Sequence, residues 1–268
     1  MTGRPADVVP AGGWSRWQRS WWYHAVVAAQ TWRGSVAGAV VFPFLFLVAM
    51  GVGVGHLVSQ HTGQVGGESY LDFLAPSLLA TTAMQLGQDE SLWPVLGAIK
   101  WVRTYHAAVA TPLDPEDVFA GKLSWVLTRG FVSSIIYTAM IGIFGALHSW
   151  WALTLPLVSD LITLAFAAPL LTWAARSQSD GPFVTYYRFA TVPMFLFSAT
   201  FYPVSAYPAA LRPLVQIVPL YHGVALARAA ATGHAQIGPV VAHVAVLAAM
   251  AAVGVVLGRR AMRRRLVD

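Results

Sequence analysis

The segment PVVAHVAVLAAMAAVGVVL, residues 239–257, is an uncharged apolar stretch, and GRRAMRRR, residues 258–265, follows it directly. A helix needs about 20 predominantly apolar residues to cross the hydrocarbon core of a bilayer. The first stretch therefore predicts a transmembrane helix over 239–257. The arginines behind it predict a cytoplasmic end, because Lys and Arg accumulate in the cytoplasmic segments of membrane proteins.

The composition extends this interpretation to the whole chain. Of its 268 residues, 57% are hydrophobic and only 10% are charged, whereas about a quarter of a soluble domain is charged. So few charges cannot cover a water-facing surface, so much of the surface must face lipid. The net charge of +6 lies at the edges of apolar runs, which suits headgroups and membrane topology better than nucleic acid. The absence of cysteine excludes disulfides and thiolate metal sites.

Five further apolar segments predict membrane helices. They cover residues 36–58, 70–99, 123–147, 152–174 and 183–202. The expected fold class is therefore an all-α polytopic membrane protein, a single domain over 1–268 with six transmembrane helices. Residues 1–35 hold no compact apolar core followed by a small-residue cleavage site, so we expect no secretory signal peptide.

The distribution of lysine and arginine predicts the orientation of these helices. The N-terminal segment, the 100–122 loop, the loop after 174 and the C-terminal tail are all basic. The opposite face has only Arg212 and Arg228, both between the fifth and sixth helices. This bias predicts a multi-pass protein of the bacterial cytoplasmic membrane with both termini in the cytoplasm.

Two segments outside the six spans need separate interpretations. In a helix over 14–33, the arginines lie opposite a stripe of four tryptophans, Trp14, Trp17, Trp21 and Trp32. Trp-rich faces with basic backs lie in the membrane interface; the alternative is a helix packed on a protein partner. Residues 203–233 are apolar but interrupted by four prolines, which predicts a pair of re-entrant or surface half-helices on the outer side.

Three patches of the sequence carry a family resemblance. The first is Phe73-Leu74-Ala75-Pro76 with Ala80 and Met84, leading to Glu90. The second is Ala110-Thr111-Pro112-Leu113, followed by Asp117-Val118, Gly121, Trp125 and Arg129. The third runs from Phe197-Ser198 through Phe201-Tyr202-Pro203, Pro208 and Pro219-Leu220-Tyr221-His222 to Arg228 and Gly233.

With these patches the chain resembles the permease subunits of type-2 ABC exporters. Within that family it is most similar to the nodulation-factor (lipo-oligosaccharide) and daunorubicin exporter permeases. The resemblance covers nearly the whole chain, and the third patch is the most specific, because Pro, aromatic, His and Arg residues recur at fixed offsets. One departure is Ala199, where relatives usually have glycine.

Energy for transport is expected to come from another subunit. The chain has no G-x-x-x-x-G-K-[ST] phosphate loop, since the GK pair at 121–122 lacks the preceding glycine at the required spacing. The expected partner is therefore an ABC ATPase, in two copies, that binds ATP and Mg²⁺. On this chain we expect no catalytic residue, cofactor or metal.

The resemblance also implies that residues 100–122 form the coupling region. A short helix at 101–109 would dock on the ATPase, and the turn after it would be fixed by its neighbours. The residues expected to take part are Trp101, Tyr105, His106, Val109, Thr111, Pro112 and Leu113. Asp114 or Asp117 is predicted to cap the helix that follows. A solvated loop is the alternative, and it explains poorly why Trp101, Tyr105 and Val109 would share one helical face.

Ionisable residues inside membrane spans usually face a cavity or a partner. The candidates for a gate or for the transport pathway are Glu90, Arg129, Asp160, His222 and Arg228. Glu90 is either a gate or substrate entrance, or one half of a structural ion pair with Arg129 or Lys100. For Asp160 we expect an interhelical hydrogen bond. For His222 and Arg228 we expect structural hydrogen bonds or outer-gate contacts.

Three functional hypotheses follow. In the first, two copies of this chain, or this chain and a homologue, export an amphipathic or lipid-linked substrate such as a glycolipid, a lipo-oligosaccharide or a hydrophobic drug. The second is a membrane-embedded enzyme acting on a lipid-linked substrate, with Glu90 and His106 as the nearest acid–base pair. The third is an ion-coupled secondary transporter, although the sequence shows no internal repeat.

Overall fold

The computed structural model describes residues 15–54 and 69–267, and within this part the chain is helical and has no strand. The elements, in chain order, are α1 (Arg16–Phe46), the π-helical η1 (Leu47–Val54), α3 (Tyr70–Ser91), α4 (Trp93–Lys100), α5 (Thr104–Val109), α6 (Pro115–Ile143), the 3₁₀-helical η2 (Trp150–Thr154), α7 (Leu155–Arg176), α8 (Gly181–Tyr186), the π-helical η3 (Tyr187–Thr191), α9 (Val192–Phe197), the 3₁₀-helical η4 (Val204–Ala206), α10 (Arg212–Ile217), α11 (Pro219–Thr232) and α12 (Ile237–Val267).

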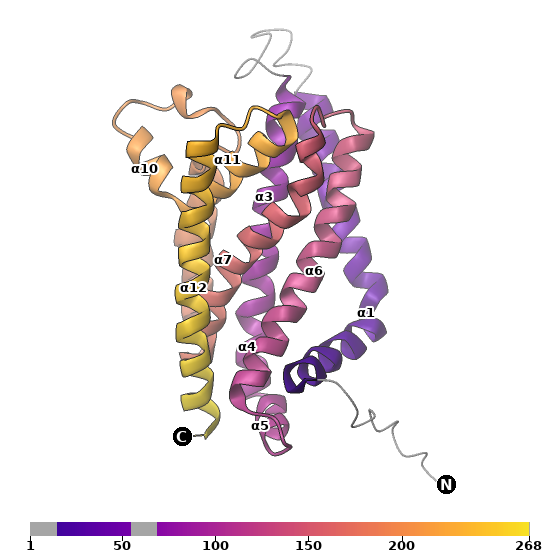
Figure 1. The fold of residues 1–268 in the computed structure, drawn as a ribbon, viewed down its shortest axis with the longest axis vertical. Coiled ribbons are helices and arrows are strands. Elements are labelled where there is room, and N and C mark those ends of the chain that lie inside the picture. The colour runs from indigo at the N-terminus through magenta and orange to yellow at the C-terminus, as the bar shows by residue number, and fades with distance from the viewer. Residues whose placement is uncertain (1–14, 55–68, 268) are drawn as a thin grey trace.

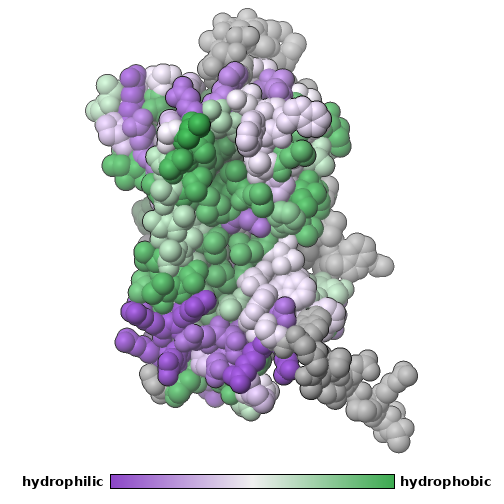
Figure 2. All heavy atoms as spheres, viewed as in Figure 1, coloured by the Kyte–Doolittle hydropathy of each residue, from purple (hydrophilic) through white to green (hydrophobic). Residues whose placement is uncertain are grey.

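The long helices run side by side between two ends of one bundle (Figure 1). We call the end with α10 and α11, at the top of Figure 1, the apical end, and the end with α5 and the last turns of α12 the basal end. Within the described residues, α6, the Trp150–Arg176 unit of η2 and α7, and α12 are long and apolar enough to cross a membrane. Figure 2 shows a broad hydrophobic band between hydrophilic ends, as a membrane protein requires.

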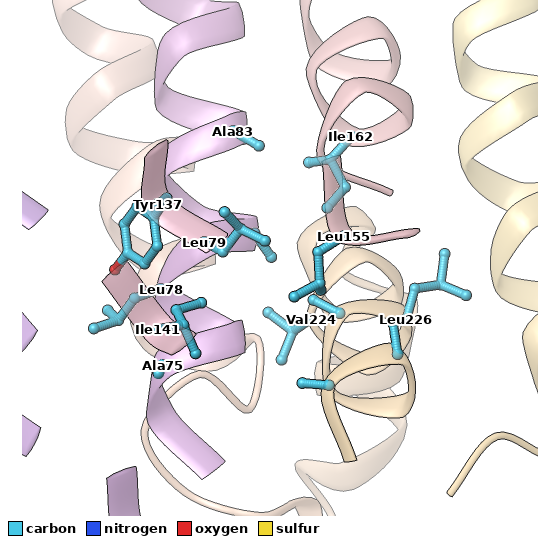
Figure 3. Close-up of a cluster of buried hydrophobic side chains, with 14 of the residues drawn as sticks. Ala75, Leu78, Leu79, Ala83, Tyr137, Ile141, Leu155, Ile162, Val224 and Leu226 are labelled. Carbon is cyan, nitrogen blue, oxygen red and sulfur yellow. The ribbon is translucent and has the colours of Figure 1, made fainter. Parts of the chain in front are cut away.

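The interior of the bundle is built on α7, which packs against α3, α6, α11 and α12. Figure 3 shows one buried apolar cluster, to which α3, α6, α7 and α11 contribute residues such as Leu79, Ile141, Ile162 and Val224. Close approach between α7 and α12 depends on Gly254, where an added Cβ would lie 2.5 Å from the backbone nitrogen of Pro169. The small-residue contact is typical of helices that pack within a bilayer.

Helix boundaries differ from the sequence expectations for local reasons. The helix expected over 70–99 breaks at Leu92, which is followed by Pro94 in the first turn of α4. The helix expected over 123–147 begins earlier, at Pro115, because Asp114 is its N-cap and Pro115 lies in its first turn. The backbone nitrogen of Asp114 donates to Asp117 Oδ2 at 3.1 Å, and Asp114 is the N-cap, so the prediction that Asp114 or Asp117 caps this helix is confirmed.

Three other expected boundaries also differ from the structure. The 14–33 and 36–58 helices are not separate, because α1 is one helix from Arg16 to Phe46, although Figure 1 shows it turning from the basal end into the bundle. Residues 55–58 of the expected span lie outside the described residues. The helix expected over 183–202 ends at Phe197, and the helix expected over 239–257 continues through the basic tail to Val267.

Candidate functional site

A cluster of ion pairs lies inside the basal half of the bundle. Glu90, in the last turn of α3, accepts a hydrogen bond from Lys122 Nζ at 2.7 Å and another from Arg129 Nη1. Both cations come from α6, and their spacing of seven residues places them on one helical face. Only 4% of the Lys122 side chain is exposed, so this lysine depends on Glu90 for its charge compensation.

The arrangement decides between the expected partners of Glu90. Of the two partners that the sequence offers for Glu90, Arg129 forms an ion pair with it and Lys100 does not. Lys100 instead donates from Nζ to the carbonyl oxygen of Gln178 at 2.6 Å. No ion pair joins Glu90 to His106 within the described chain, and the exposed His106 is not brought beside it as an acid–base site would require.

Two aromatic side chains connect this cluster to α1 and α5. The ring of His24, on α1, meets the ring of Tyr105, on α5, edge to face with centroids 6.3 Å apart. Tyr105 is only 3% exposed, and burial together with the negative charge of Glu90 raises the pKa of its hydroxyl. Burial and then the positive charge of Lys122 lower the pKa of His24 to about 4. The cluster therefore joins α1, α3, α5 and α6 at one place.

A second polar layer links α3 to the π-helical η3. Gln88 donates from Nε2 to the hydroxyl of Tyr186 at 3.1 Å and accepts from Thr191 Oγ1 at 3.1 Å. Next to it, the hydroxyl of Tyr187 donates to Asp89 Oδ1. π-Helical turns are often found at functional sites, and here the turn lies directly against the polar end of α3.

The turn between α4 and α6 forms the basal tip of the molecule. Trp101 and Val102 are 56% and 71% exposed, and His106, Thr111 and Pro112 are exposed as well. Val109 and Leu113 are half-buried. Arg103, in the left-handed conformation with φ 57°, redirects the chain before α5 begins at Thr104. The expected helix over 101–109 is therefore shorter, and Trp101 does not share a helical face with the buried Tyr105.

An acidic groove lies beside this tip. It has a volume of about 500 Å³ and is lined by Asp114, Pro115, Glu116 and Asp117 from α6 and by Arg263 and Val267 from α12. Arg16 of α1 donates to Asp114 Oδ2 at 2.8 Å across an exposed surface. An exposed ion pair of this kind adds little stability, so we read it as a link between α1 and the start of α6.

Comparison with known proteins finds relatives that match nearly the whole chain. Nodulation protein J of Rhizobium leguminosarum bv. viciae is 30% identical over 265 residues, 97% of this chain and 98% of the relative. Nodulation protein J of Rhizobium meliloti (strain 1021) is 28% identical over 261 residues, 97% of both chains. The chain belongs to the ABC-2 type permease family that contains nodulation protein J. No family model matches this permease.

A more distant relative is named for its transport role. Inner membrane transport permease YadH of Escherichia coli (strain K12) is 24% identical over 170 residues, 63% of this permease and 65% of the relative. The names of the relatives and the apolar helices together make this chain an ABC transporter permease of a membrane.

At the apical end of the permease, Arg228 links α11 to α3 and to the segment after α9 through hydrogen bonds. Its Nε donates to the carbonyl oxygen of Phe73 at 3.0 Å, and its Nη2 donates to the carbonyl oxygens of Ala199 at 2.5 Å and Thr200 at 3.1 Å. The guanidinium carbon lies 3.4 Å from the centroid of the Phe73 ring. Ala199 has φ 57°, a left-handed conformation that glycine adopts more readily than alanine.

His222 and Asp160 are the remaining pathway candidates. The Nδ1 atoms of His222, on α11, and His243, on α12, are 2.8 Å apart, and the part of the chain that the structure describes holds no group of three metal-ligating side chains. Asp160 Oδ1 is buried and has no hydrogen-bond partner among the described residues. It lies against Gly130, where an added Cβ would be 3.0 Å away.

The tryptophans of α1 fall into different environments. Trp21 Nε1 donates to Thr128 Oγ1 at 3.0 Å and its ring packs edge-on against Trp125, so this part of the stripe contacts α6 of the same chain. Trp17 is partly exposed. Trp14 and the side chain of Trp32 lie outside the described residues. Trp22, which the stripe does not include, is exposed.

Sequence reasoning missed Lys122 and His24 as members of the ion-pair cluster. The sequence places Lys122 in the basic 100–122 loop, because the helix is expected to begin at residue 123. With the start of α6 at Pro115, the seven-residue spacing from Arg129 places Lys122 on the face that meets Glu90. No local signal marks His24, because its position depends on how α1 packs on α6.

Proposed function

We propose that this permease is the transmembrane subunit of an ATP-driven exporter, in which the basal tip receives the movement of a separate ABC ATPase. The observation that carries the proposal is the continuity between the exposed tip and the buried cluster. Trp101 and Val102 lie at the surface, while Tyr105, a few residues further on, is buried beside Glu90 and His24. A displacement of α5 would therefore act on α1, α3 and α6 together.

The proposed topology has six membrane crossings with the basal end in the cytoplasm of a bacterium. The crossings are the later part of α1 with η1, then α3 with α4, then α6, α7, the α8–η3–α9 unit and α12. Its support is the basic basal end, where the tail arginines, Arg176 and Lys100 lie, against Arg212 and Arg228 at the apical end. The segment 203–233, with α10 and α11, would lie at the outer side.

In the proposed cycle two permease copies, or this permease and a homologue, form the pathway at their interface. Two ATPase subunits bind ATP and Mg²⁺ at the basal tips, and their closure moves the permease between inward-open and outward-open states. The substrate class is amphipathic or lipid-linked. Exposed aromatic side chains at the basal end of α1, such as Trp22 and Tyr23, suit a substrate drawn laterally from the adjacent leaflet.

The test is co-purification with the ATPase encoded beside the permease, through a tag on the permease only. We expect Val102→Asp combined with His106→Asp to reduce recovery of the ATPase and its hydrolysis in nanodiscs at least tenfold, since both side chains are exposed at the tip. Ala209→Asp, exposed at the apical end, is the matched control and should retain both.

Failure of the wild-type permease to recover an ATPase, from that neighbour or from a whole-lysate pull-down, would contradict the proposal. Transport that survives ATP depletion and collapses with an ion gradient would replace it with the secondary-transporter hypothesis. Turnover of a lipid-linked substrate by the isolated chain would replace it with the enzyme hypothesis.

A further inference from the structure

The basic end of α12 is part of one continuous helix with the apolar segment before it. Arg259, Arg260, Arg263 and Arg264 are exposed. No carboxylate of the described residues lies within 4.0 Å of these four guanidinium groups. Exposed cations without acidic partners among the described residues are available to an anionic ligand.

Two of these arginines continue the lipid-facing surface of α12. Val246, Val253 and Leu257 are exposed apolar side chains of a helix that can span a membrane. Arg260 and Arg264 follow them at intervals of three and four residues, which keeps all five on one helical face. Arg260 lies about 4.5 Å beyond Leu257 along the helix axis. The face that contacts acyl chains therefore passes directly into guanidinium groups at headgroup depth.

Arg263 points to a different environment on the same helix. It lines the acidic groove with Asp114, Glu116 and Asp117 of α6. Arg260 and Arg264 are not among the residues of that groove. At the basic end of α12, Arg263 therefore faces carboxylates of its own chain, whereas Arg260 and Arg264 lie on the helical face that continues the exposed apolar surface.

Two general explanations for terminal arginines do not account for this arrangement. Favourable interaction with the helix dipole is confined to the last turn, which contains Arg264 but not Arg260, since Arg260 precedes Val267 by about two turns. The rule that basic residues stay in the cytoplasm concerns their number in a segment, not the helical face on which they lie.

Neighbouring contacts hold the end of α12 in place. Arg265 Nη2 donates to Gln178 Oε1 at 3.2 Å, and Lys100 Nζ donates to the carbonyl oxygen of the same residue. Arg176 is exposed at the adjacent end of α7. Figure 2 shows hydrophilic residues gathered over the lower end of α12, directly below the hydrophobic band. The result is a fixed basic surface at the edge of the apolar belt.

We propose that Arg260 and Arg264 form a binding site for the phosphate headgroup of an anionic phospholipid. A guanidinium group matches a phosphate with two parallel hydrogen bonds, and the apolar side chains above it accommodate the acyl chains of the same lipid. The site anchors the basal end of α12 against the membrane surface.

The experiment is native mass spectrometry of the full-length permease with phosphatidylglycerol, and with phosphatidylcholine as the zwitterionic reference. Wild-type protein should retain phosphatidylglycerol adducts preferentially. In Arg260→Gln/Arg264→Gln the Kd for phosphatidylglycerol should rise about 25-fold, because each arginine near an anionic surface contributes about 1 kcal/mol, or about fivefold in Kd. Arg263→Gln, which removes the same kind of charge from the groove side, is the matched control and should bind like wild type.

A charge-retaining pair, Arg260→Lys/Arg264→Lys, separates binding from folding, since it should keep most of the preference for phosphatidylglycerol. The proposal is overturned if the double Gln variant binds phosphatidylglycerol like wild type. It is also overturned if Arg263→Gln loses as much binding, because the charge and not its face would then matter. Loss of ATPase recovery with unchanged lipid binding would assign this surface to the protein partner instead.

Discussion

The basal and apical ends of the bundle compensate the positive charges of their interior side chains in different ways. At the basal end, Lys122 and Arg129 share one carboxylate, Glu90. At the apical end, Arg228 is held by backbone carbonyl oxygens and by the ring of Phe73. The first arrangement joins helices through side chains that another charge can rearrange, whereas the second fixes the backbone of an irregular segment.

This difference suits the two ends to different tasks. A carboxylate shared by two cations can exchange partners when a helix shifts, so the basal cluster is suited to transmit movement from α5. Three carbonyl contacts by one guanidinium hold α3, α11 and the segment after α9 in a single arrangement. We therefore propose that the apical end is a rigid frame, in contrast to the basal cluster.

Loss of the shared carboxylate should have the largest effect. Glu90→Gln leaves Lys122 buried without a counter-charge, and breaking a buried pair in this way costs about 3–5 kcal/mol. We expect the thermal midpoint in nanodiscs to fall by roughly 10 °C, measured by the intrinsic fluorescence of the tryptophans. Glu116→Gln, exposed in the acidic groove, is the matched control; equal midpoints for the two variants would show that the cluster is not a structural centre.

Removal of the apical cation should have a smaller effect. Arg228→Met leaves the carbonyl oxygens of Phe73, Ala199 and Thr200 without this donor, at a cost of about 2–3 kcal/mol. Arg228→Lys keeps the charge but not the planar fork, so an intermediate loss is expected. Proteolysis within 198–211, followed by mass spectrometry, reports the release of this segment. Protection identical to wild type in both variants would contradict the frame.

Acid should weaken the basal cluster through His24. Its pKa of about 4 lies below the usual value of about 6.5, so the folded state favours the neutral ring. This preference contributes fully to the free energy of unfolding above pH 6.5. The contribution is lost as the pH falls through 4, and about 1–2 kcal/mol of it is lost near pH 5. His24→Gln should flatten the stability curve between pH 6.5 and 4. Curves of equal slope for the two proteins would exclude this role.

The smallest effect should be a gain at the apical end. Ala199 has φ 57°, a conformation that glycine adopts without a Cβ penalty. Ala199→Gly should raise the free energy of unfolding by about 0.5–1 kcal/mol, seen as a slightly higher thermal midpoint. Ala209→Gly, in the exposed part of the same segment, should lower it or leave it unchanged. A loss at Ala199 would mean that its methyl group is needed for packing.

The sequence predicts the helical fold and the cap at Asp114, because apolar length and capping residues are local signals. It also predicts that Glu90 and Arg129 have a partner or face a cavity, since ionisable residues inside membrane spans usually do. It does not predict Lys122 or His24 as their neighbours, because the approach of α1 to α6 depends on tertiary contacts such as Ser20 against Gly121. The π-helical turn at Tyr187 is likewise not marked by any local signal in the sequence.

The central claim is that the basal tip contacts an ATPase, and the absence of cysteine from the chain allows a direct measurement. A single cysteine in Val102→Cys, labelled with benzophenone maleimide, should cross-link on illumination to the co-expressed ATPase, with a yield that changes when ATP is added. Ala209→Cys, labelled in the same way at the apical end, should give no such product. An intact complex in which Val102→Cys fails to cross-link, or in which both positions cross-link equally, would contradict the account.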